Sequence, residues 1–379
     1  MRVIPIASGK GGVGKSLVAA NLSIAFAQAG KRVILADLDL GASNLHLIIG
    51  SRSPRSGIGT FLNDTRSDFN QVIVDSGIPN LRFIPGDAEI PGTANLKPPQ
   101  MNALARRLLS LEADILVLDL GAGTHQSILD FFLLSGQGII VTTPTVTATL
   151  NAYLFLKNVV FRLMYSSFSK GSRAYEYLEK LRKDKSGLQK LYIPKLMDVI
   201  AEIDPESHGK FKERISLFHP RLILNMIEEP KQAEVAQKIR RSCVEYLDLQ
   251  LEHLGIIYRD SIQDTALQAR LPILLYKNQA ILSQAIYRIA DKILQSDEKD
   301  YFLEKRGIDE SFAEAEMEAE VDYQNKMGYV EELLHCGALS EGDLIETVKS
   351  QQYEITQLRK ENLFLKSKLS QAFSQGFKP

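Results

Sequence analysis

Short apolar runs alternate with longer stretches of helical periodicity over the first part of the chain. Continuous apolar runs at residues 2–7, 33–36 and 115–118 predict buried strands, because a strand covered on both faces shows no polar alternation. Residues 17–29 have the apolar spacing of a helix, which ends at Gly30. Strands that alternate with helices predict an α/β fold with a doubly wound, mostly parallel sheet over residues 1 to about 160.

The alternation breaks between residues 162 and 220. This stretch is polar, rich in lysine and helical in rhythm, and it separates the preceding helix from a further apolar run at residues 222–225. The run at residues 254–257 and a helical pattern at 281–294 continue the first domain. We therefore predict one domain over residues 1–295 with a helical insert at 162–220. Two interpretations of the insert stay open: a surface that docks a partner, or a cap that packs beside the sheet.

The remaining residues predict two further segments. Residues 296–330 are strongly acidic and are expected to form a solvated linker or helix. Residues 331–379 form a helical tail with a heptad pattern. Its eight a and d positions are Val348, Gln351, Ile355, Leu358, Asn362, Leu365, Leu369 and Ala372, and all but Gln351 and Asn362 are apolar.

Three structures for the tail are compatible with this pattern. A polar Asn362 at an a position is typical of a short parallel two-stranded coiled coil, where it favours dimers. The same stripe would also suit a single amphipathic helix packed on the first domain. A third interpretation is a membrane-surface helix that uses Phe364, Phe373 and Phe377.

Composition limits which partners and which cell compartment we expect for the protein. The chain has 379 residues, 45% of them hydrophobic, and 45 basic residues against 46 acidic ones, so its charge does not favour nucleic-acid binding. Its two cysteines, Cys243 and Cys336, form no Cys-x-x-Cys pair, which indicates a reducing compartment. The first residues enter a strand directly, and no apolar run approaches the roughly 20 residues of a membrane span. We expect a cytoplasmic protein, with peripheral contact at the inner face of the membrane if the tail binds lipid.

The chemistry of the chain is concentrated in the loop after the first predicted strand. Its sequence is Ser8-Gly9-Lys10-Gly11-Gly12-Val13-Gly14-Lys15-Ser16. Glycines let consecutive N–H groups turn toward phosphate oxygens, and the following helix adds the positive end of its dipole. Lys15 can then reach the β and γ phosphates, and the Ser16 hydroxyl can bind Mg²⁺. The loop therefore predicts a nucleotide site, and it carries a second lysine, Lys10, that the ordinary pattern does not require.

Three aspartates follow apolar runs at the positions where parallel strands end. Asp37 and Asp39 follow residues 33–36, and Asp119 follows residues 115–118. Open α/β sheets bind ligands at the carboxyl ends of their strands. A single aspartate there would often only begin a turn. Three beside a phosphate-binding loop fit a Mg²⁺-nucleotide hydrolase, which needs carboxylates for the ion's water shell and one to orient the attacking water.

These motifs together resemble one family. The loop with two lysines, the sequence from Asp37 to Asn44 and the sequence Asp119-Leu-Gly-Ala-Gly123 are similar to the deviant Walker ATPases of the MinD/ParA class, most of all to its MinD and FlhG branches. Later segments, including the strand that ends at Asn225, continue the resemblance to about residue 295. Members usually carry an acidic residue where this chain has His46. We interpret His46 as a structural hydrogen-bonding residue rather than a metal ligand.

The resemblance implies a MinD-like P-loop fold and roles for single residues. ATP would lie between two subunits, and Lys10 of each would reach the phosphates bound by the other. Asp39 would position the hydrolytic water, Asp37 would support the switch segment, and Asp119 would hold Mg²⁺ through water. Asn225 would contact the adenine edge.

We therefore expect a slow, regulatory ATP hydrolase with ATP and Mg²⁺ as cofactors. It would form an ATP-dependent homodimer and use the insert or the tail to bind a protein partner. The function expected by resemblance is spatial or numerical regulation of a structure such as a flagellum or division site. A ParA-like ATPase that partitions DNA or other cargo is the alternative; it would need a basic DNA-binding surface. An ATP-dependent small-molecule ligase fits less well, because no Cys or Ser-His constellation appears.

Overall fold

The structure is a computed structural model of the chain. It describes residues 1–41, 43–51, 56–63, 68–86, 96–183, 192–296 and 305–335, with single positions at Gly342, Ile345, Lys349 and Gln352. The chain divides into two compact units, residues 1–322 and 323–379. The coiled coil and the membrane helix predicted for the tail lie almost wholly outside the described residues.

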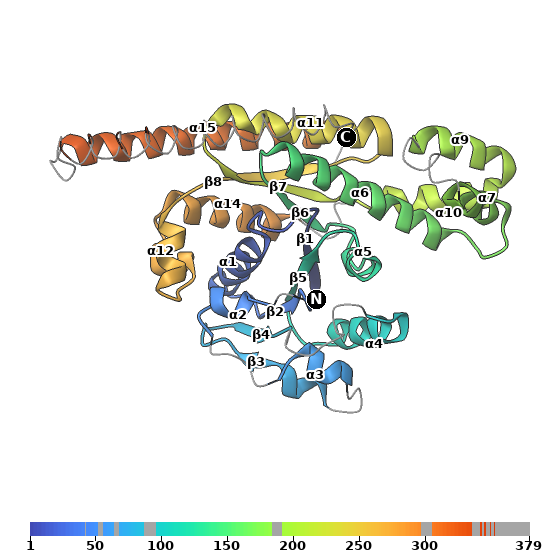
Figure 1. The fold of residues 1–379 in the computed structure, drawn as a ribbon, viewed down its shortest axis with the longest axis horizontal. Coiled ribbons are helices and arrows are strands. Elements are labelled where there is room, and N and C mark those ends of the chain that lie inside the picture. Colours follow the sequence, from blue (N-terminus) through green and yellow to red (C-terminus); the bar gives the residue numbers. More distant parts are fainter. Residues whose placement is uncertain are drawn as a thin grey trace, which may run out of the picture. The chain divides into compact units, whose positions relative to one another are not determined.

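A parallel sheet forms the centre of the first unit (Figure 1). In the described residues it has eight strands in the order β3-β4-β2-β5-β1-β6-β7-β8, and only β3 runs antiparallel to its neighbour. The bounds are β1 (Arg2–Ser8), β2 (Val33–Leu38), β3 (Val74–Asp75), β4 (Leu81–Ile84), β5 (Ile115–Ala122), β6 (Ile139–Thr142), β7 (Arg221–Ile227) and β8 (Glu252–Tyr258). The doubly wound sheet predicted from the apolar runs is confirmed.

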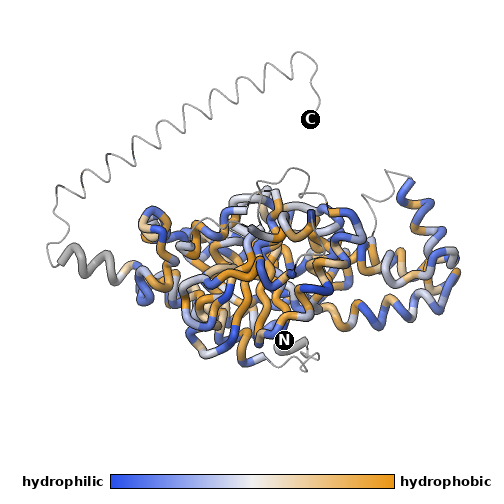
Figure 2. Tube along the Cα trace, turned by 90° about the horizontal axis from the view of Figure 1, so that it is seen from below, coloured by the Kyte–Doolittle hydropathy of each residue, from blue (hydrophilic) through white to orange (hydrophobic). Residues whose placement is uncertain are grey.

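Helices cover both faces of the sheet (Figure 1). One face carries α1 (Lys15–Gln28) and α14 (Ile281–Gln295), and the other carries α5 (Gln126–Phe132), α6 (Val146–Ser167) and α11 (Glu234–Leu247). Because helices cover both faces, the strands are apolar along their length, and every residue of β2 is buried. Figure 2 shows the hydrophobic segments gathered at the centre. The remaining helices are α2 (Leu45–Ile48), α3 (Ile58–Asn63), η1 (Phe69–Val72), α4 (Pro98–Leu109), η2 (Pro230–Ala233), α12 (Ile262–Gln268) and α13 (Ile273–Tyr276).

The insert at 162–220 is helical. It contains the end of α6 and three further helices, α7 (Arg173–Lys183), α9 (Ile193–Ile203) and α10 (Pro205–Ser216). The Tyr165 hydroxyl of α6 donates to the Leu178 carbonyl of α7, and the Phe168 and Phe211 rings meet edge to face 6.5 Å apart. The Tyr192 ring contacts Tyr246 of α11 in the same way. The insert therefore packs on α6 and α11, as the cap interpretation requires.

The acidic segment forms part of a long helix, α15 (Lys305–His335), whose residues up to Asp322 belong to the first unit. Ile308, Phe312, Ala315 and Ala319 are buried at spacings of three and four residues. Lys292 of α14 pairs with Glu318 at 2.9 Å, and Arg288 pairs with Asp322. The compact unit thus continues to Asp322, beyond the boundary that we expected near residue 295, because an apolar stripe lies among the acidic residues.

His253 at the start of β8 lies beneath α15. Its side chain is 1% exposed, its ring is stacked obliquely on Phe312, and neither ring nitrogen has a hydrogen-bond partner. Burial, together with the Lys292 ammonium, lowers the pKa of His253 from 6.5 to about 3. In the unfolded chain this imidazole takes up a proton as the pH falls through 6.5, whereas in the folded chain it stays neutral. Acidification therefore removes stability across that interval.

We expect the free energy of unfolding to fall as the pH drops from 6.5 toward 3, by at most about 5 kcal/mol from His253 alone. His253→Phe should flatten this slope, since it removes the titrating group and keeps a ring beside Phe312. Denaturant unfolding, followed by circular dichroism at a series of pH values, measures this slope. His208→Phe, a change at a half-buried histidine of α10, is the matched control. An unchanged slope in His253→Phe would contradict the assignment.

Candidate functional site

The phosphate-binding loop lies between β1 and α1, at the carboxyl edge of the sheet. Gly12 and Gly14 have φ angles of 80° and 83°, in the left-handed region that glycine adopts without strain. Gly14 also precedes the first turn of α1, and no side chain caps that helix end. The first N–H groups of a 14-residue helix therefore remain available to an anion, and the helix dipole adds a positive potential there.

Two neighbours fix the shape of the loop. A Cβ atom at Gly9 would lie 2.1 Å from the Asn151 carbonyl oxygen of α6, so only glycine fits there. The side-chain amide of Asn225, in β7, donates to the Val13 carbonyl at 2.9 Å and lies directly against Gly14. The structure thus gives Asn225 a task in holding the loop. Its contact with adenine stays a prediction.

Lys15 is buried beneath the loop and pairs with Asp119. The Lys15 Nζ lies 2.5 Å from Asp119 Oδ1 and donates to the Ser16 hydroxyl at 3.2 Å. The Lys15 and Asp119 side chains are 7% and 1% exposed. Burial raises the pKa of the Asp119 carboxyl, and the adjacent Lys15 ammonium opposes this shift. An ammonium held this close to the loop is placed to meet bound phosphate.

Asp37 occupies the strand position beside Asp119 and binds the segment that follows β2. The two aspartates are register partners in β2 and β5. The Asp37 carboxylate accepts hydrogen bonds from the Asp39 N–H at 3.0 Å, the Ser43 hydroxyl at 2.7 Å and the Leu45 N–H at 3.4 Å. Burial and the nearby Asp119 charge raise the pKa of Asp37 to about 7. Both aspartates lie within their strands rather than after them, because β2 and β5 run further than their apolar runs indicate.

This cluster fits a divalent cation. Asp119 Oδ2 is buried and has no hydrogen-bond partner, and two adjacent carboxyl groups have raised pKa values because each is buried near another acid. Hard oxygen ligands of this kind, with the Ser16 hydroxyl beside Lys15, are those that Mg²⁺ prefers. A bound cation would offset the cost of burying both charges.

Asp39 lines a pocket of about 330 Å³ next to this cluster. Gly121 lies close enough that a Cβ there would be 3.5 Å from Asp39 Oδ1. His125, which our sequence reasoning did not single out, lines the same pocket from the loop after β5. The sequence feature that could have pointed to His125 is its position six residues after Asp119. The pocket provides space for a water molecule or a small ligand beside the Asp39 carboxylate.

Lys10 points away from this buried cluster. Its Nζ donates to the Thr147 hydroxyl, at the start of α6, at 2.9 Å and in an exposed position. Thr147 was also missed, because nothing in its sequence context marks a polar partner for the loop. A pocket of about 350 Å³ extends from Lys10 across the loop to the ends of β6, β7 and β8, where Thr143, Met226 and Arg259 line it.

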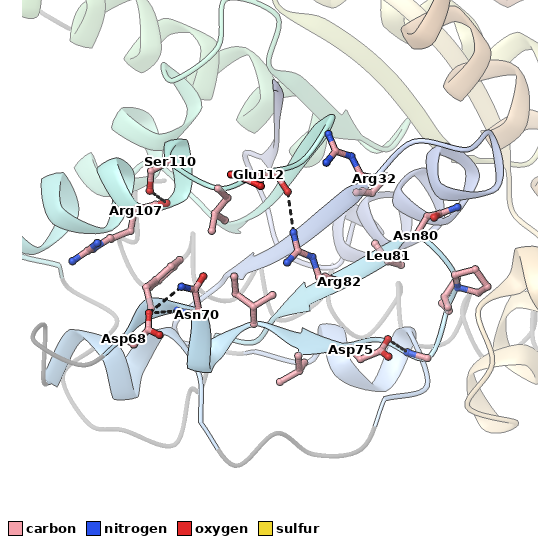
Figure 3. Close-up of a pocket in the computed structure, with 18 residues that line it drawn as sticks. Arg32, Asp68, Asn70, Asp75, Asn80, Leu81, Arg82, Arg107, Ser110 and Glu112 are labelled. Carbon is pink, nitrogen blue, oxygen red and sulfur yellow. Dashed lines mark hydrogen bonds between the residues drawn. The ribbon is translucent and has the colours of Figure 1, made fainter.

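A larger pocket, of about 1090 Å³, lies at the opposite edge of the sheet (Figure 3). It is lined by the amino ends of β2 and β4 and by the end of α4, whereas parallel α/β sheets bind their ligands at the carboxyl ends. The Arg82 guanidinium there donates to the Glu112 carbonyl, and Arg32 pairs with Asp114. Both guanidinium groups already have partners in the chain, so we assign the chemistry to the loop edge.

Comparison with known proteins agrees with this geometry. Residues 4–273 match the CobQ/CobB/MinD/ParA nucleotide binding domain. The septum site-determining protein MinD of Synechocystis sp. is 33% identical over 153 residues, 40% of this chain and 56% of that protein. The antiactivator FleN of Pseudomonas aeruginosa is 30% identical over 159 residues, 41% of this chain and 56% of that protein. The matched stretch thus spans little more than half the length of these relatives.

The fold is also found in a solved structure of a similar protein. MinD of Pyrococcus horikoshii, complexed with Mg-ADP, superposes with a TM-score of 0.53 at 20% sequence identity. The match covers 78% of this chain and 96% of that one. At this identity the similarity establishes the fold alone.

Proposed function

Because the chain belongs to the CobQ/CobB/MinD/ParA family of nucleotide-binding domain proteins, we propose that it is a Mg²⁺-dependent ATPase that works as an ATP-driven dimerisation switch. The observation that carries the proposal is the pair of lysines in one loop. Lys15 is buried against Asp119, whereas Lys10 lies at the surface on Thr147. One subunit therefore has its own phosphate-binding cation and presents a second one outward.

The site residues divide the work of hydrolysis. The loop N–H groups and Lys15 bind the phosphates, and Ser16 with Asp119 and Asp37 would hold Mg²⁺, directly or through water. The ion, when bound, would neutralise charge on the phosphate oxygens. Asp39 would orient the attacking water from the adjoining pocket. Lys10 of the partner subunit would stabilise the negative charge that develops on the transferred phosphate.

Asp37 connects the proposed metal cluster to the segment that follows β2. Its carboxylate binds Asp39, Ser43 and Leu45, and Leu45 begins α2. A change in charge at the metal cluster would therefore alter the hydrogen bonds of this segment directly. Such a link is what a switch requires if nucleotide state is to determine subunit association.

The partner in the wider function would be another protein, bound through the insert or the tail. Among the relatives, MinD carries the name septum site-determining protein and FleN the name antiactivator. We propose that this chain likewise regulates the position or number of a cell structure.

Sedimentation of the full chain tests the switch. With ATP and Mg²⁺ the mass should rise from the 42.3 kDa of the single chain to twice that value. With ADP in place of ATP the mass should be that of the single chain. If the tail already pairs two chains, this change would be hidden. A chain that ends after Asp322 should therefore be measured in parallel, since it keeps the buried stripe of α15. An equal mass with ATP and ADP in both proteins would refute the switch.

A further inference from the structure

The segment that follows β5 carries His125 past the phosphate-binding loop. Gly123 in this segment has a φ of 98°, and its N–H donates to the Ser8 carbonyl at 3.2 Å. Ser8 begins the phosphate-binding loop, and its hydroxyl donates to the Lys10 carbonyl at 3.0 Å. The backbone that leads to His125 is therefore attached to the backbone that would bind phosphate.

The lack of a side chain at Gly121 brings α5 close to Asp39. A Cβ atom at Gly121 would lie 3.5 Å from Asp39 Oδ1 and 3.4 Å from Ile128 Cδ1 of α5. His125 immediately precedes α5 and lies three positions before Ile128, so the two side chains share one face of the helix. Both line the pocket of about 330 Å³ that Asp39 also lines.

The His125 imidazole is exposed, and it makes no hydrogen bond or ion pair with another residue that the structure describes. It does not cap α5. Among the described residues that line the pocket, Asp39 is the only other one that titrates, and Ser127 adds a hydroxyl. The rest of this lining is apolar or glycine. An imidazole and a carboxylate thus share a largely apolar pocket beside the phosphate site.

Other charged groups on the neighbouring elements are paired or face solvent. Asp130, further along α5, pairs with Arg162 of α6. Asp119, two residues before Gly121, pairs with Lys15. Lys97, just before α4, is exposed. Within the described part of the chain, the carboxylate that shares the pocket with the imidazole is therefore that of Asp39.

We propose that His125 takes up the proton of the water that attacks the γ-phosphate of ATP, while Asp39 holds that water in place. The inference rests on the proposed ATPase activity and adds a second catalytic residue to it. The water oxygen forms a bond to the γ-phosphorus, and the bond from that phosphorus to the bridging oxygen breaks, so that ADP leaves with the electron pair. The proton passes from the water to the neutral imidazole and then to solvent, which reaches the exposed His125. The Asp39 carboxylate stabilises the imidazolium that forms between these two transfers.

An imidazole suits this task better than a carboxylate does. Unperturbed aspartates titrate near about pH 4, and unperturbed imidazoles near about pH 6.5. A general base is most effective when its pKa lies near the pH of the reaction. At neutral pH the proton is therefore assigned to His125, and the orientation of the water to Asp39.

His125→Ala should release phosphate from ATP about a hundredfold more slowly than wild type. Its mass should still double with ATP and Mg²⁺, because Lys10 and Lys15 are unchanged. Free imidazole in solution should raise its rate at least about tenfold, since the space left by an exposed side chain is open to a small base. The ratio of the rates with and without imidazole should increase as the pH rises through about 6.5, where an imidazole loses its proton. A purely structural role of His125 would give no such rescue.

Two further variants complete the test. His125→Gln keeps a polar side chain that cannot take up a proton, so it should be as slow as His125→Ala. His208→Ala, at a half-buried histidine of α10, should hydrolyse ATP like wild type and should not respond to imidazole.

Three results would overturn the role of His125 while wild type is active: a wild-type rate in His125→Ala, no effect of imidazole on that variant, or a wild-type rate in His125→Gln. A wild-type chain that releases no phosphate with ATP and Mg²⁺ would instead refute the ATPase activity itself, and the role of His125 with it. Phosphate release by wild type therefore separates a failure of the proposed function from a failure of this inference.

Discussion

Lys10→Ala should bind ATP and Mg²⁺ but should keep its ADP-state mass when ATP is added. In the proposed dimer each Lys10 makes a charge-assisted contact with the other subunit's phosphates, and such contacts contribute about 1.5–3 kcal/mol each. Losing two of them should weaken ATP-dependent association at least about a hundredfold. Nucleotide binding should survive, because Lys15, the loop amides and Asp119 are unchanged within each subunit. Sedimentation and binding of a fluorescent ATP analogue measure the two properties separately.

Two matched variants make this result specific. Thr147→Val removes the hydroxyl that now accepts from Lys10 but leaves the ammonium, so ATP-dependent association should persist. Lys15→Ala removes the buried cation and should lose nucleotide binding itself. If Lys10→Ala doubles its mass with ATP as wild type does, the second lysine has no role between subunits. The site would then be an ordinary P-loop that is complete in one chain.

Much of this site could be predicted from sequence because its parts are local. The loop needs glycines at particular backbone angles, and these stand at Gly12 and Gly14. Parallel strands bury both faces, so β2 and β5 appear as continuous apolar runs, and a residue at the end of each run falls at the ligand edge. The family resemblance then supplied roles for these residues, which the geometry by itself does not assign.

Features that depend on contacts between distant segments were not predictable in this way. The Asn225 amide meets the Val13 carbonyl across 212 residues, and nothing near either residue indicates it. Phe312 and Ala315 of α15 lie among acidic residues whose charge suggested a solvated segment, although their spacing was already present in the sequence.

Asp39→Ala should hydrolyse ATP at least about a hundredfold more slowly than wild type, since loss of a residue that orients or deprotonates water typically has an effect of this size. The Asp39 N–H still donates to Asp37 after the change, because that bond is made by the backbone. The segment that follows β2 should therefore keep its shape, and ATP binding should be retained. The dimer formed with ATP should then persist, because the step that ends it has been removed.

Phosphate release and sedimentation over the same time course distinguish this result from a general loss of function. In wild type the doubled mass should decay as phosphate appears, whereas in Asp39→Ala both quantities should stay nearly constant. Asp39→Asn keeps the size and polarity of the side chain but removes its charge, so it should behave like the alanine variant if the carboxylate acts on water. Recovery of hydrolysis in Asp39→Asn would instead assign Asp39 a structural role beside Gly121, where its Oδ1 lies close to the β5 backbone. Rapid decay of the Asp39→Ala dimer without phosphate release would separate association from hydrolysis and contradict the switch.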